Sequence, residues 1–220
     1  MDQPPPSSDD LASLRQPYDV PGLFEADLLG CPFDQFQRWF TQAKAAGIKE
    51  PNAMTLATAS RDGLPDARIV LLKGLNPASG FAFYTNYEST KAKQLDANPR
   101  ATLVFYWDRL DRQVRVQGGV QKLPEATSDR YFAQRPRGSQ IGAWTSPQSS
   151  VVPDRDVLAQ READWIQHYD GQDVPRPPHW GGYAVSPERI EFWQGQPSRL
   201  HDRLVYARDG EAWKIERLAP

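Results

Sequence analysis

The chain has 220 residues, of which 39% are hydrophobic and 11% aromatic, and its formal net charge at pH 7 is −2. This composition is typical of a globular protein with one large or two small domains, and the charge excludes a protein built to coat nucleic acid. No apolar run reaches the roughly 18 residues of a membrane span, no signal-peptide pattern is present, and Cys31 is the only cysteine, so we expect a cytoplasmic protein without an intrachain disulfide.

Residues 1–20 are rich in proline, serine and acidic residues, which predicts a flexible N-terminal arm. Arg15 and Tyr18 are its only bulky cationic and aromatic side chains. We expect residues 21–220 to form a single domain. A helix is predicted from Pro32, because apolar residues then recur at spacings of three and four until Gly47 ends the pattern.

The middle of the chain predicts strands joined by short turns. Strands are expected at 53–60, 66–73, 81–86, 101–107 and 112–123. In the last of these, Gln113, Arg115 and Gln117 alternate with valines, which indicates one polar face and one core face. Between them a short helix is predicted from Ser89, a favourable N-cap, to just before Pro99.

The last hundred residues mix helices and strands. A helix is predicted from Pro124 through Tyr131, and the glycine-containing run at 135–144 is predicted to be a loop. A helix at about 154–169 is expected to bury Val157, Leu158, Trp165, Ile166 and Tyr169. Strands are predicted at 183–185, 189–193, 203–207 and 212–217. This order favours a mainly β fold, an antiparallel Greek-key-like barrel with flanking helices, over a doubly wound sheet.

Two kinds of chemistry are poorly supported. Cys31 has no histidine near it in the sequence, and no G-x-S-x-G elbow is present, which argues against nucleophilic catalysis. The three histidines lack a ligand at helical spacing, so we expect no metal site. We expect His168 to be solvated and His179 to be structural. With no obvious acid–base pair, a bound cofactor would have to supply the chemistry.

Cationic and hydroxyl-bearing side chains recur in several separate segments, as binding of a phosphate monoester would require. Arg68 and Lys73 are five residues apart and face opposite sides of a regular strand, unless a bulge intervenes or Lys73 lies at the strand end. The other candidates are Tyr84, Thr85, Lys91, Arg135, Arg137, Ser139, Gln148 and Ser149. Gln113 and Gln148 could satisfy a heteroaromatic edge, and Trp193 could shield its rim. The alternative is an ordinary soluble surface with Arg–Glu pairs.

Residues 191–203 read E-F-W-Q-G-Q-P-S-R-L-H-D-R. If the end of this run is extended, Arg199, His201 and Arg203 point to one face with no acid beside them. Such a row suits an anion or an electron-rich ring. An exposed basic edge strand that deters aggregation is the alternative.

From about Glu50 to Pro220 the chain resembles the pyridoxine (pyridoxamine) 5′-phosphate oxidase family. The resemblance is carried by an ordered set of runs: R-I-V-L-L-K, F-Y-T-N, R-P-R-G-S-Q-I-G-A-W, S-P-Q-S, H-W-G-G, E-F-W-Q-G, R-L-H-D-R and E-R-L-A-P. It implies an FMN-binding split β-barrel that works as a homodimer with FMN at the interface. It also implies oxidation of pyridoxine or pyridoxamine 5′-phosphate by oxygen to pyridoxal 5′-phosphate, with hydrogen peroxide and, from the amine, ammonia.

The resemblance also implies site residues. Those expected to hold FMN are Arg68, Ile69, Val70, Leu71, Leu72, Lys73, Tyr84, Thr85, Lys91, Gln113, Gln148 and Ser149, with Trp193 and Arg203 from the second subunit. Those expected at the substrate are Lys73, Tyr131, Arg135 and Ser139 on its phosphate, the catalytic pair Arg199 and His201 over its ring together with Leu200, and Arg15 and Tyr18 as a cover.

The chain departs from the family pattern at Thr90, where many members have arginine before the lysine, so weaker FMN retention is expected. Two other functions compete with the oxidase: a non-catalytic flavin or pyridoxal-phosphate carrier on the same barrel, and a single-strand nucleic-acid binder. The intact R-L-H-D-R run disfavours the carrier, and the net charge of −2 disfavours the nucleic-acid binder.

Overall fold

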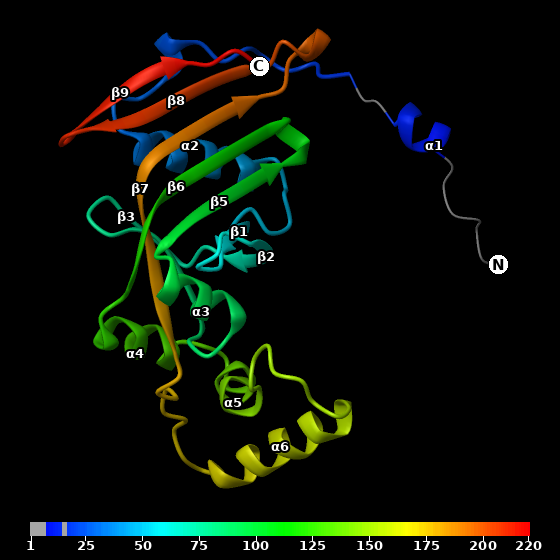
Figure 1. Ribbon diagram of the computed structural model, residues 1–220, viewed down its shortest axis with the longest axis vertical. Helices are drawn as coiled ribbons and strands as arrows, with labels where there is room; N and C mark the ends of the chain where they lie inside the picture. The colour runs from blue at the N-terminus through cyan, green and yellow to red at the C-terminus, as the bar shows by residue number, and fades with distance from the viewer. Residues whose placement is uncertain (1–7, 15–16) are drawn as a thin grey trace.

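The computed structural model describes residues 8–14 and 17–220 (Figure 1). Its helices are α1 (Ser8–Ser13), α2 (Pro32–Ala45), α3 (Thr90–Ala97), α4 (Glu125–Ala133), α5 (Arg137–Thr145) and α6 (Arg155–His168), with 3-10 turns η1 (Glu25–Asp27), η2 (Asp108–Leu110) and η3 (Pro197–Arg199). Its strands are β1 (Ala53–Ala59), β2 (Pro65–Leu71), β3 (Gly74–Asn76), β4 (Gly80–Asn86), β5 (Arg100–Trp107), β6 (Arg112–Lys122), β7 (Trp180–Gln194), β8 (Asp202–Asp209) and β9 (Ala212–Arg217). In these residues no helix has the length and apolarity to cross a membrane.

One antiparallel sheet holds all nine strands that the described residues form. Its main path runs β2-β1-β5-β6-β7-β4-β3, and β8 pairs with β7 and β9. The predicted antiparallel, mainly β fold with flanking helices is confirmed. The sheet is not closed, because no pairing among the described strands joins β2 to β3.

Strand β7 is the spine of the sheet. It pairs with β6 over residues 183–194, with β4 over residues 180–185 and with β8 over residues 189–194. The predicted pair of strands at 183–185 and 189–193 is therefore wrong, since they form one strand. A bulge beside Gly118 allows this: the register shifts there, and a Cβ on Gly118 would lie 1.9 Å from the Ser186 carbonyl oxygen.

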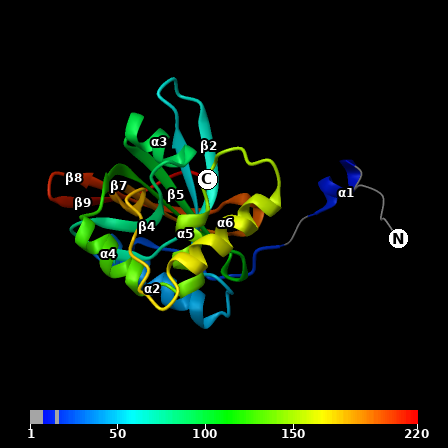
Figure 2. The same ribbon diagram turned by 90° about the horizontal axis from the view of Figure 1, so that it is seen from below.

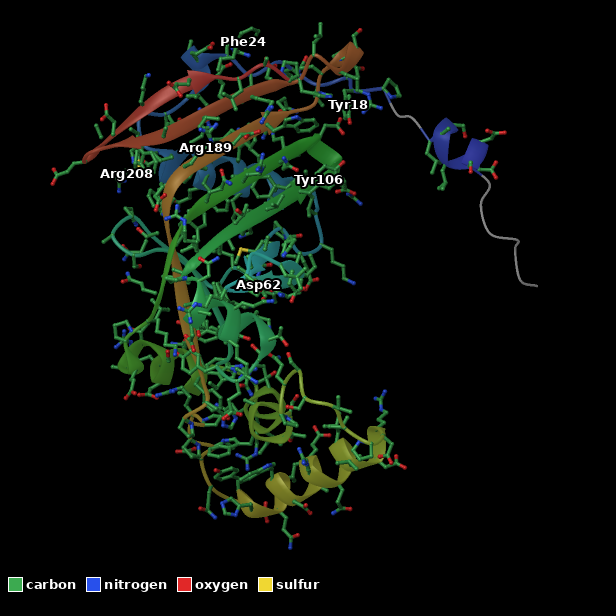
Figure 3. All side chains as sticks on the ribbon, in the orientation of Figure 1. Tyr18, Phe24, Asp62, Tyr106, Arg189 and Arg208 are labelled. Atoms are coloured by element: carbon green, nitrogen blue, oxygen red, sulfur yellow. The ribbon has the colours of Figure 1, made fainter. Side chains whose placement is uncertain are left out.

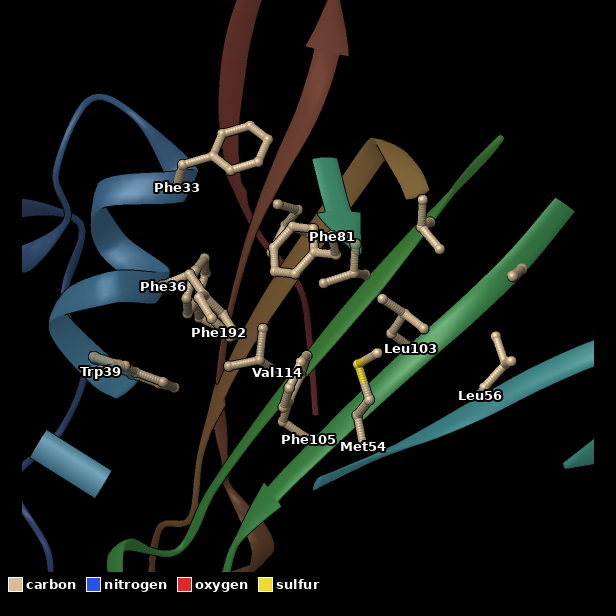
Figure 4. Packing of buried hydrophobic residues seen from close by; sticks show 14 of the residues in the cluster. Phe33, Phe36, Trp39, Met54, Leu56, Phe81, Leu103, Phe105, Val114 and Phe192 are labelled. Carbon is tan, nitrogen blue, oxygen red and sulfur yellow. The ribbon is translucent and has the colours of Figure 1, made fainter. Parts of the chain in front are cut away.

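The main core lies between α2 and the sheet (Figure 4). Phe36 contacts the rings of Phe81 and Phe105, with centroids 5.0 and 4.9 Å away, and Trp39 meets Phe192 edge-on at 5.1 Å. The spacing of three and four predicted this apolar face, and Gly47, with φ of 72°, follows the helix end as expected. The core thus fixes the sheet on which the candidate site is built.

A smaller apolar cluster holds α4, α5 and the start of β7 together at the other end of the molecule (Figures 1 and 2). It contains Phe132, Ile141, Tyr169, Val174 and Trp180. The prediction of a loop at 135–144 is wrong, because residues 137–145 form α5. Packing of Ile141 in this cluster outweighs the helix-weakening effect of two glycines, about 1 kcal/mol each.

Helix α6 buries less than its pattern predicted. No residue within it is buried, Ile166 is 53% exposed, and Tyr169, which caps its end, is 8% exposed. In the single chain, the expected burial of Ile166 is therefore wrong. The exposed His168 agrees with its predicted solvated position, while the His179 Nε2–H donates to the Ala143 carbonyl oxygen at 3.2 Å, as expected of a structural histidine.

Candidate functional site

A cavity of about 500 Å³ opens between the sheet and the cluster of α4 and α5. Six separate segments contribute its lining: Arg68–Leu71 and Lys73, Tyr84–Asn86, Lys91, Tyr131 with Arg135, residues of and after α5 from Ser139 to Gln148, and Trp180. Arg68 lies on β2, and Lys73 follows the end of that strand, which is how two residues five apart reach the same cavity.

One wall of the cavity comes from α5. Ser139, Gly142, Ala143 and Ser146 line it, at spacings of three, four and seven from the first residue. This is one face of a helix, and its small side chains leave the cavity open. Gly142, Ala143 and Ser146 were not predicted as site residues, because the run was expected to be a loop, although their helical spacing is visible in the sequence. Asn86 and Trp180 were not predicted as lining residues either.

Stacked aromatic rings form another wall. The ring of Tyr84 lies 4.0 Å from Tyr131 and 5.5 Å from Trp180, both nearly parallel to it. The H-W-G-G run explains the close fit, because a Cβ on Gly182 would lie 2.8 Å from Cε1 of Tyr84. The guanidinium of Arg135 stacks 4.5 Å from the Trp180 ring centroid.

Arg135 is the most unusual cation of the cavity. Its Nη1 is buried and has no hydrogen-bond partner, and burial lowers the pKa of its guanidinium. A buried donor without an acceptor costs roughly 1–3 kcal/mol, so such groups are retained where a ligand satisfies them. Arg137, which the sequence analysis grouped with it, turns away and donates to the carbonyl oxygens of Tyr169 and Gln172 at 2.6 and 2.8 Å.

A second cationic group lies where β2 faces α3. Burial, and then the charge of Arg68, lower the pKa of Lys91, whose Nζ donates to Gln148 Oε1 at 2.9 Å. Thr85 Oγ1 donates to the same oxygen at 3.0 Å. Arg68 donates to Thr58 Oγ1 at 2.6 Å and pairs with Asp66, so its charge is partly neutralised. Both cationic groups suit an anion held by side chains instead of a phosphate loop.

Other predicted site residues do not line this cavity. Leu72 packs against the main core, Gln113 pairs with Trp193 across β6 and β7, and Ser149 is exposed with φ of 70°. Trp193, Arg199, Leu200, His201 and Arg203 are also absent from its lining. Arg15 lies outside the described residues.

These C-terminal residues lie near the far end of β7, where Trp193 pairs with Arg203 and contacts His201 and Tyr18. Figure 3 labels Tyr18 at this end of the sheet. The His201 ring is 4.7 Å from Trp193 and 5.3 Å from Tyr18, which meets it edge-on. Trp180 begins β7 and Trp193 lies next to its end, and the two ends of this long strand lie far apart in the molecule (Figure 1). One copy of the chain therefore does not bring both groups to one place.

The predicted row of Arg199, His201 and Arg203 on one strand face is wrong. Pro197–Arg199 form a 3-10 turn with φ of 57° at Ser198 and 64° at Arg199, and β8 begins only at Asp202. The expectation of no neighbouring acid is also wrong. Glu191, which is 4% exposed, accepts hydrogen bonds from Arg203 Nε at 2.9 Å and Nη2 at 3.1 Å, and it pairs with Arg115.

Comparison with known proteins gives consistent matches. Residues 40–169 match the family model described as pyridoxamine 5′-phosphate oxidase, and residues 180–220 match the pyridoxine 5′-phosphate oxidase C-terminal dimerisation region. Pyridoxine/pyridoxamine 5′-phosphate oxidases from Synechocystis sp. and Burkholderia multivorans are each 57% identical over 96% of this chain and 98% and 99% of their own lengths.

Solved structures agree with this. PhzG from Burkholderia lata 383, in complex with tetrahydrophenazine-1-carboxylic acid, aligns with a TM-score of 0.85 at 32% identity, over 91% of this chain and 99% of its own. A pyridoxamine 5′-phosphate oxidase-related, FMN-binding protein from Nostoc punctiforme aligns with a TM-score of 0.69 at 16% identity, over 88% of this chain and all of its own. The latter shows a shared fold.

Proposed function

The chain belongs to the pyridoxine/pyridoxamine 5′-phosphate oxidase family, and on that premise we propose that it oxidises pyridoxine or pyridoxamine 5′-phosphate to pyridoxal 5′-phosphate with FMN and oxygen. Hydrogen peroxide is the second product, and the amine substrate also releases ammonia. The observation that carries the proposal is the buried, unpartnered Nη1 of Arg135 in a cavity of about 500 Å³.

The substrate phosphate is proposed to bind Arg135, Tyr131, Ser139 and Lys73. All four line the cavity, and together they offer a guanidinium, an ammonium and two hydroxyls. Phosphate oxygens would satisfy the buried Nη1 that no protein group satisfies. Arg135 already stacks on Trp180, so it is held in place before the ligand arrives.

FMN is proposed to bind along β2 with its phosphate near Arg68 and Lys91. The main-chain run Arg68–Leu71, the hydroxyl of Thr85 and the amide of Gln148 line the same cavity. The lowered pKa of Lys91 fits this role, because an anion would offset the burial and the neighbouring charge that lower it. Thr90 is exposed beside Lys91 and offers no charge. We therefore expect Thr90→Arg to tighten FMN binding several-fold at low salt, measured by flavin fluorescence.

A homodimer is proposed, in which a second copy supplies Trp193, Arg203, Arg199 and His201. The separation of these residues from the cavity along β7 supports this, as does the match of residues 180–220 to a dimerisation region. Apolar side chains that the dimer could cover are exposed near both groups: Ile69 is 65% and Leu200 is 70% exposed.

When held by the residues that line the cavity, FMN would supply the redox chemistry of the site, a two-electron oxidation of the substrate at C4′ with oxygen as the final acceptor. The protein's part is orientation and charge. The partner's guanidinium at Arg199 would lie over the substrate ring and stabilise negative charge that develops there. The stacked rings of Tyr84, Tyr131 and Trp180 form one wall of the site.

The test is an anaerobic titration of the purified protein. We expect a yellow protein whose colour bleaches when pyridoxine 5′-phosphate is added and returns with air. A yellow protein that does not bleach would support the flavin carrier, and a protein unable to take up FMN would contradict both. Bleaching by tetrahydrophenazine-1-carboxylic acid, the ligand in the PhzG structure, but not by pyridoxine 5′-phosphate would contradict the proposed substrate.

A matched variant tests the role of Arg199. Arg199→Met keeps bulk and removes charge, and Arg199 is exposed at the end of the turn Pro197–Arg199. We expect turnover to fall by roughly 100-fold while FMN occupancy stays close to that of the parent. Unchanged turnover would contradict the role.

A further inference from the structure

We propose that His201 serves the reaction as a hydrogen-bond donor through Nε2–H and does not accept a proton. The inference deepens the proposed oxidase function and rests on it for the identity of the acceptor, an oxygen or nitrogen of the bound pyridine ring. It rests on the structure alone for the position of the proton.

The imidazole receives a hydrogen bond from the main chain. The backbone N–H of Gln196 donates to His201 Nδ1 at 3.1 Å. A backbone amide can only donate, so Nδ1 must present its lone pair. A neutral imidazole carries a single N–H, and its proton therefore sits on Nε2. The main chain thus selects the tautomer.

The surroundings hold this ring orientation. Trp193 packs at 4.7 Å on one side, and the edge contact with Tyr18 lies at 5.3 Å. The turn that carries Gln196 is fixed as well, because Gly195 N donates to Asp111 O at 2.8 Å and Gln196 Nε2 donates to Pro21 O at 3.3 Å. A flip of the imidazole ring would place a carbon, and not Nδ1, opposite the N–H of Gln196.

Protonation of the ring is opposed by the same contact. An imidazolium carries a proton on both nitrogens, so its Nδ1–H would face the N–H of Gln196. Burial and the positive charge of Arg199 also lower the pKa of His201. The adjacent acid does not offset this, because the Asp202 carboxylate accepts from Leu23 N at 2.9 Å and from Arg217 Nη1 at 2.6 Å. The phenol of Tyr18 is the other titratable group packed against the ring.

The consequence concerns what His201 can do. As the Nε2–H tautomer it has no lone pair at the nitrogen that faces away from the turn. To act as a base there, it would first have to move its proton to Nδ1 and lose the Gln196 hydrogen bond. Donation from Nε2 needs no such change, so the geometry suits stabilisation of charge on the ring and not proton removal.

The direct test is long-range ¹H–¹⁵N NMR of the full-length protein with ¹⁵N-labelled histidine. The chain has three histidines, so the His201 signals are assigned by their loss in His201→Gln. We expect a pyridine-like Nδ1 and a pyrrole-like Nε2 from pH 7 to 8. A pyrrole-like Nδ1, or an imidazolium near neutral pH, would overturn the proposal. This readout needs no turnover, so its failure is distinct from a failure of the oxidase function.

Two variants test the role in turnover. Asn places its amide near Nδ1 and keeps an acceptor for Gln196, whereas Gln places an N–H donor near the position of Nε2. We expect the kcat of His201→Gln to be roughly 10-fold or more above the kcat of His201→Asn. His201→Gln should also retain the pH profile of the parent. Equal losses in both variants, or loss of one limb of the pH profile in His201→Gln, would refute donation as the role.

Discussion

Replacing Arg135 by Met should separate stability from ligand binding. The buried Nη1 has no partner, which costs roughly 1–3 kcal/mol, while stacking on Trp180 at 4.5 Å returns roughly 0.5–2 kcal/mol. Met keeps most of the apolar stem and removes the unsatisfied donor. The free energy of unfolding should therefore stay constant or rise by about 1 kcal/mol, a Tm change between zero and about +4 °C for a chain of this length.

Binding of phosphate esters should change in the opposite direction. Hydrogen bonds to charged groups contribute about 1.5–3 kcal/mol each, so loss of two such bonds should raise the Kd of pyridoxine 5′-phosphate at least 100-fold. Thermal unfolding with and without the ester, at equal protein concentration, measures both effects in one assay. Anaerobic flavin bleaching gives kcat/KM for the same variant.

Arg137→Met is the matched control, two residues along the chain. Arg137 does not line the cavity, and its guanidinium donates to two carbonyl oxygens at the end of α6. Its loss should lower stability by about 2 kcal/mol and leave the Kd of the ester unchanged. If Arg135→Met instead lost more than about 1 kcal/mol of stability, or if Arg137→Met lost the ester, the account of a preformed, unsatisfied phosphate pocket would be refuted.

Three further changes test other parts of the fold. Glu191→Gln should cost about 2–3 kcal/mol in urea unfolding, because the buried carboxylate holds Arg203, and a loss below about 1 kcal/mol would show that the pair adds little. Gly118→Ala should cost about 1–3 kcal/mol or more, since its Cβ would meet the Ser186 carbonyl at 1.9 Å; an unchanged Tm would contradict the close crossing. Burial raises the pKa of Tyr206 to about 12, so the stability that its protonated phenol contributes is complete below its unfolded pKa of about 10 and is lost as pH rises toward 12. Tyr206→Phe should therefore reduce the loss of unfolding free energy between pH 10 and 12, and an identical dependence of that free energy on pH in both proteins would contradict the raised pKa.

Much of the fold could be predicted from local patterns. The core face of α2, the alternation of Val114 and Val116 in β6 and the N-cap at Ser89 all agree with the structure. Each depends on side-chain periodicity or on a hydrogen bond within one turn, where the nearest residues in sequence are also the nearest in space.

The wrong predictions have long-range causes. Helix α5 forms despite two glycines because Ile141 packs with residues of α4 and β7. Strand β7 continues past Pro187 because Gly118, on a different strand, leaves room for it. Neither partner is visible from the local sequence, and in both cases tertiary packing overrides the local propensity.

The residues that line the cavity were predictable only in part, and their arrangement was not predictable. Arg68, Lys91 and Arg135 line one cavity, as grouped motifs implied. The turn at Arg199 was not predictable, because positive φ is uncommon for residues other than glycine. The pairing of Arg203 with Glu191 depends on the register of β7 and β8, which residue types alone do not specify.

The length of β7 makes a genetic consequence testable. We propose that each reaction centre draws its phosphate pocket from one copy and its C-terminal residues from another. A substitution in the pocket and a substitution in the C-terminal residues of the same chain would then affect two different centres. Chains carrying Arg135→Met and chains carrying Arg199→Met, each inactive alone, should regain activity when they are unfolded together and refolded as a mixture. Half of the molecules would be hybrids under random pairing, and each hybrid would hold one intact centre and one doubly damaged centre.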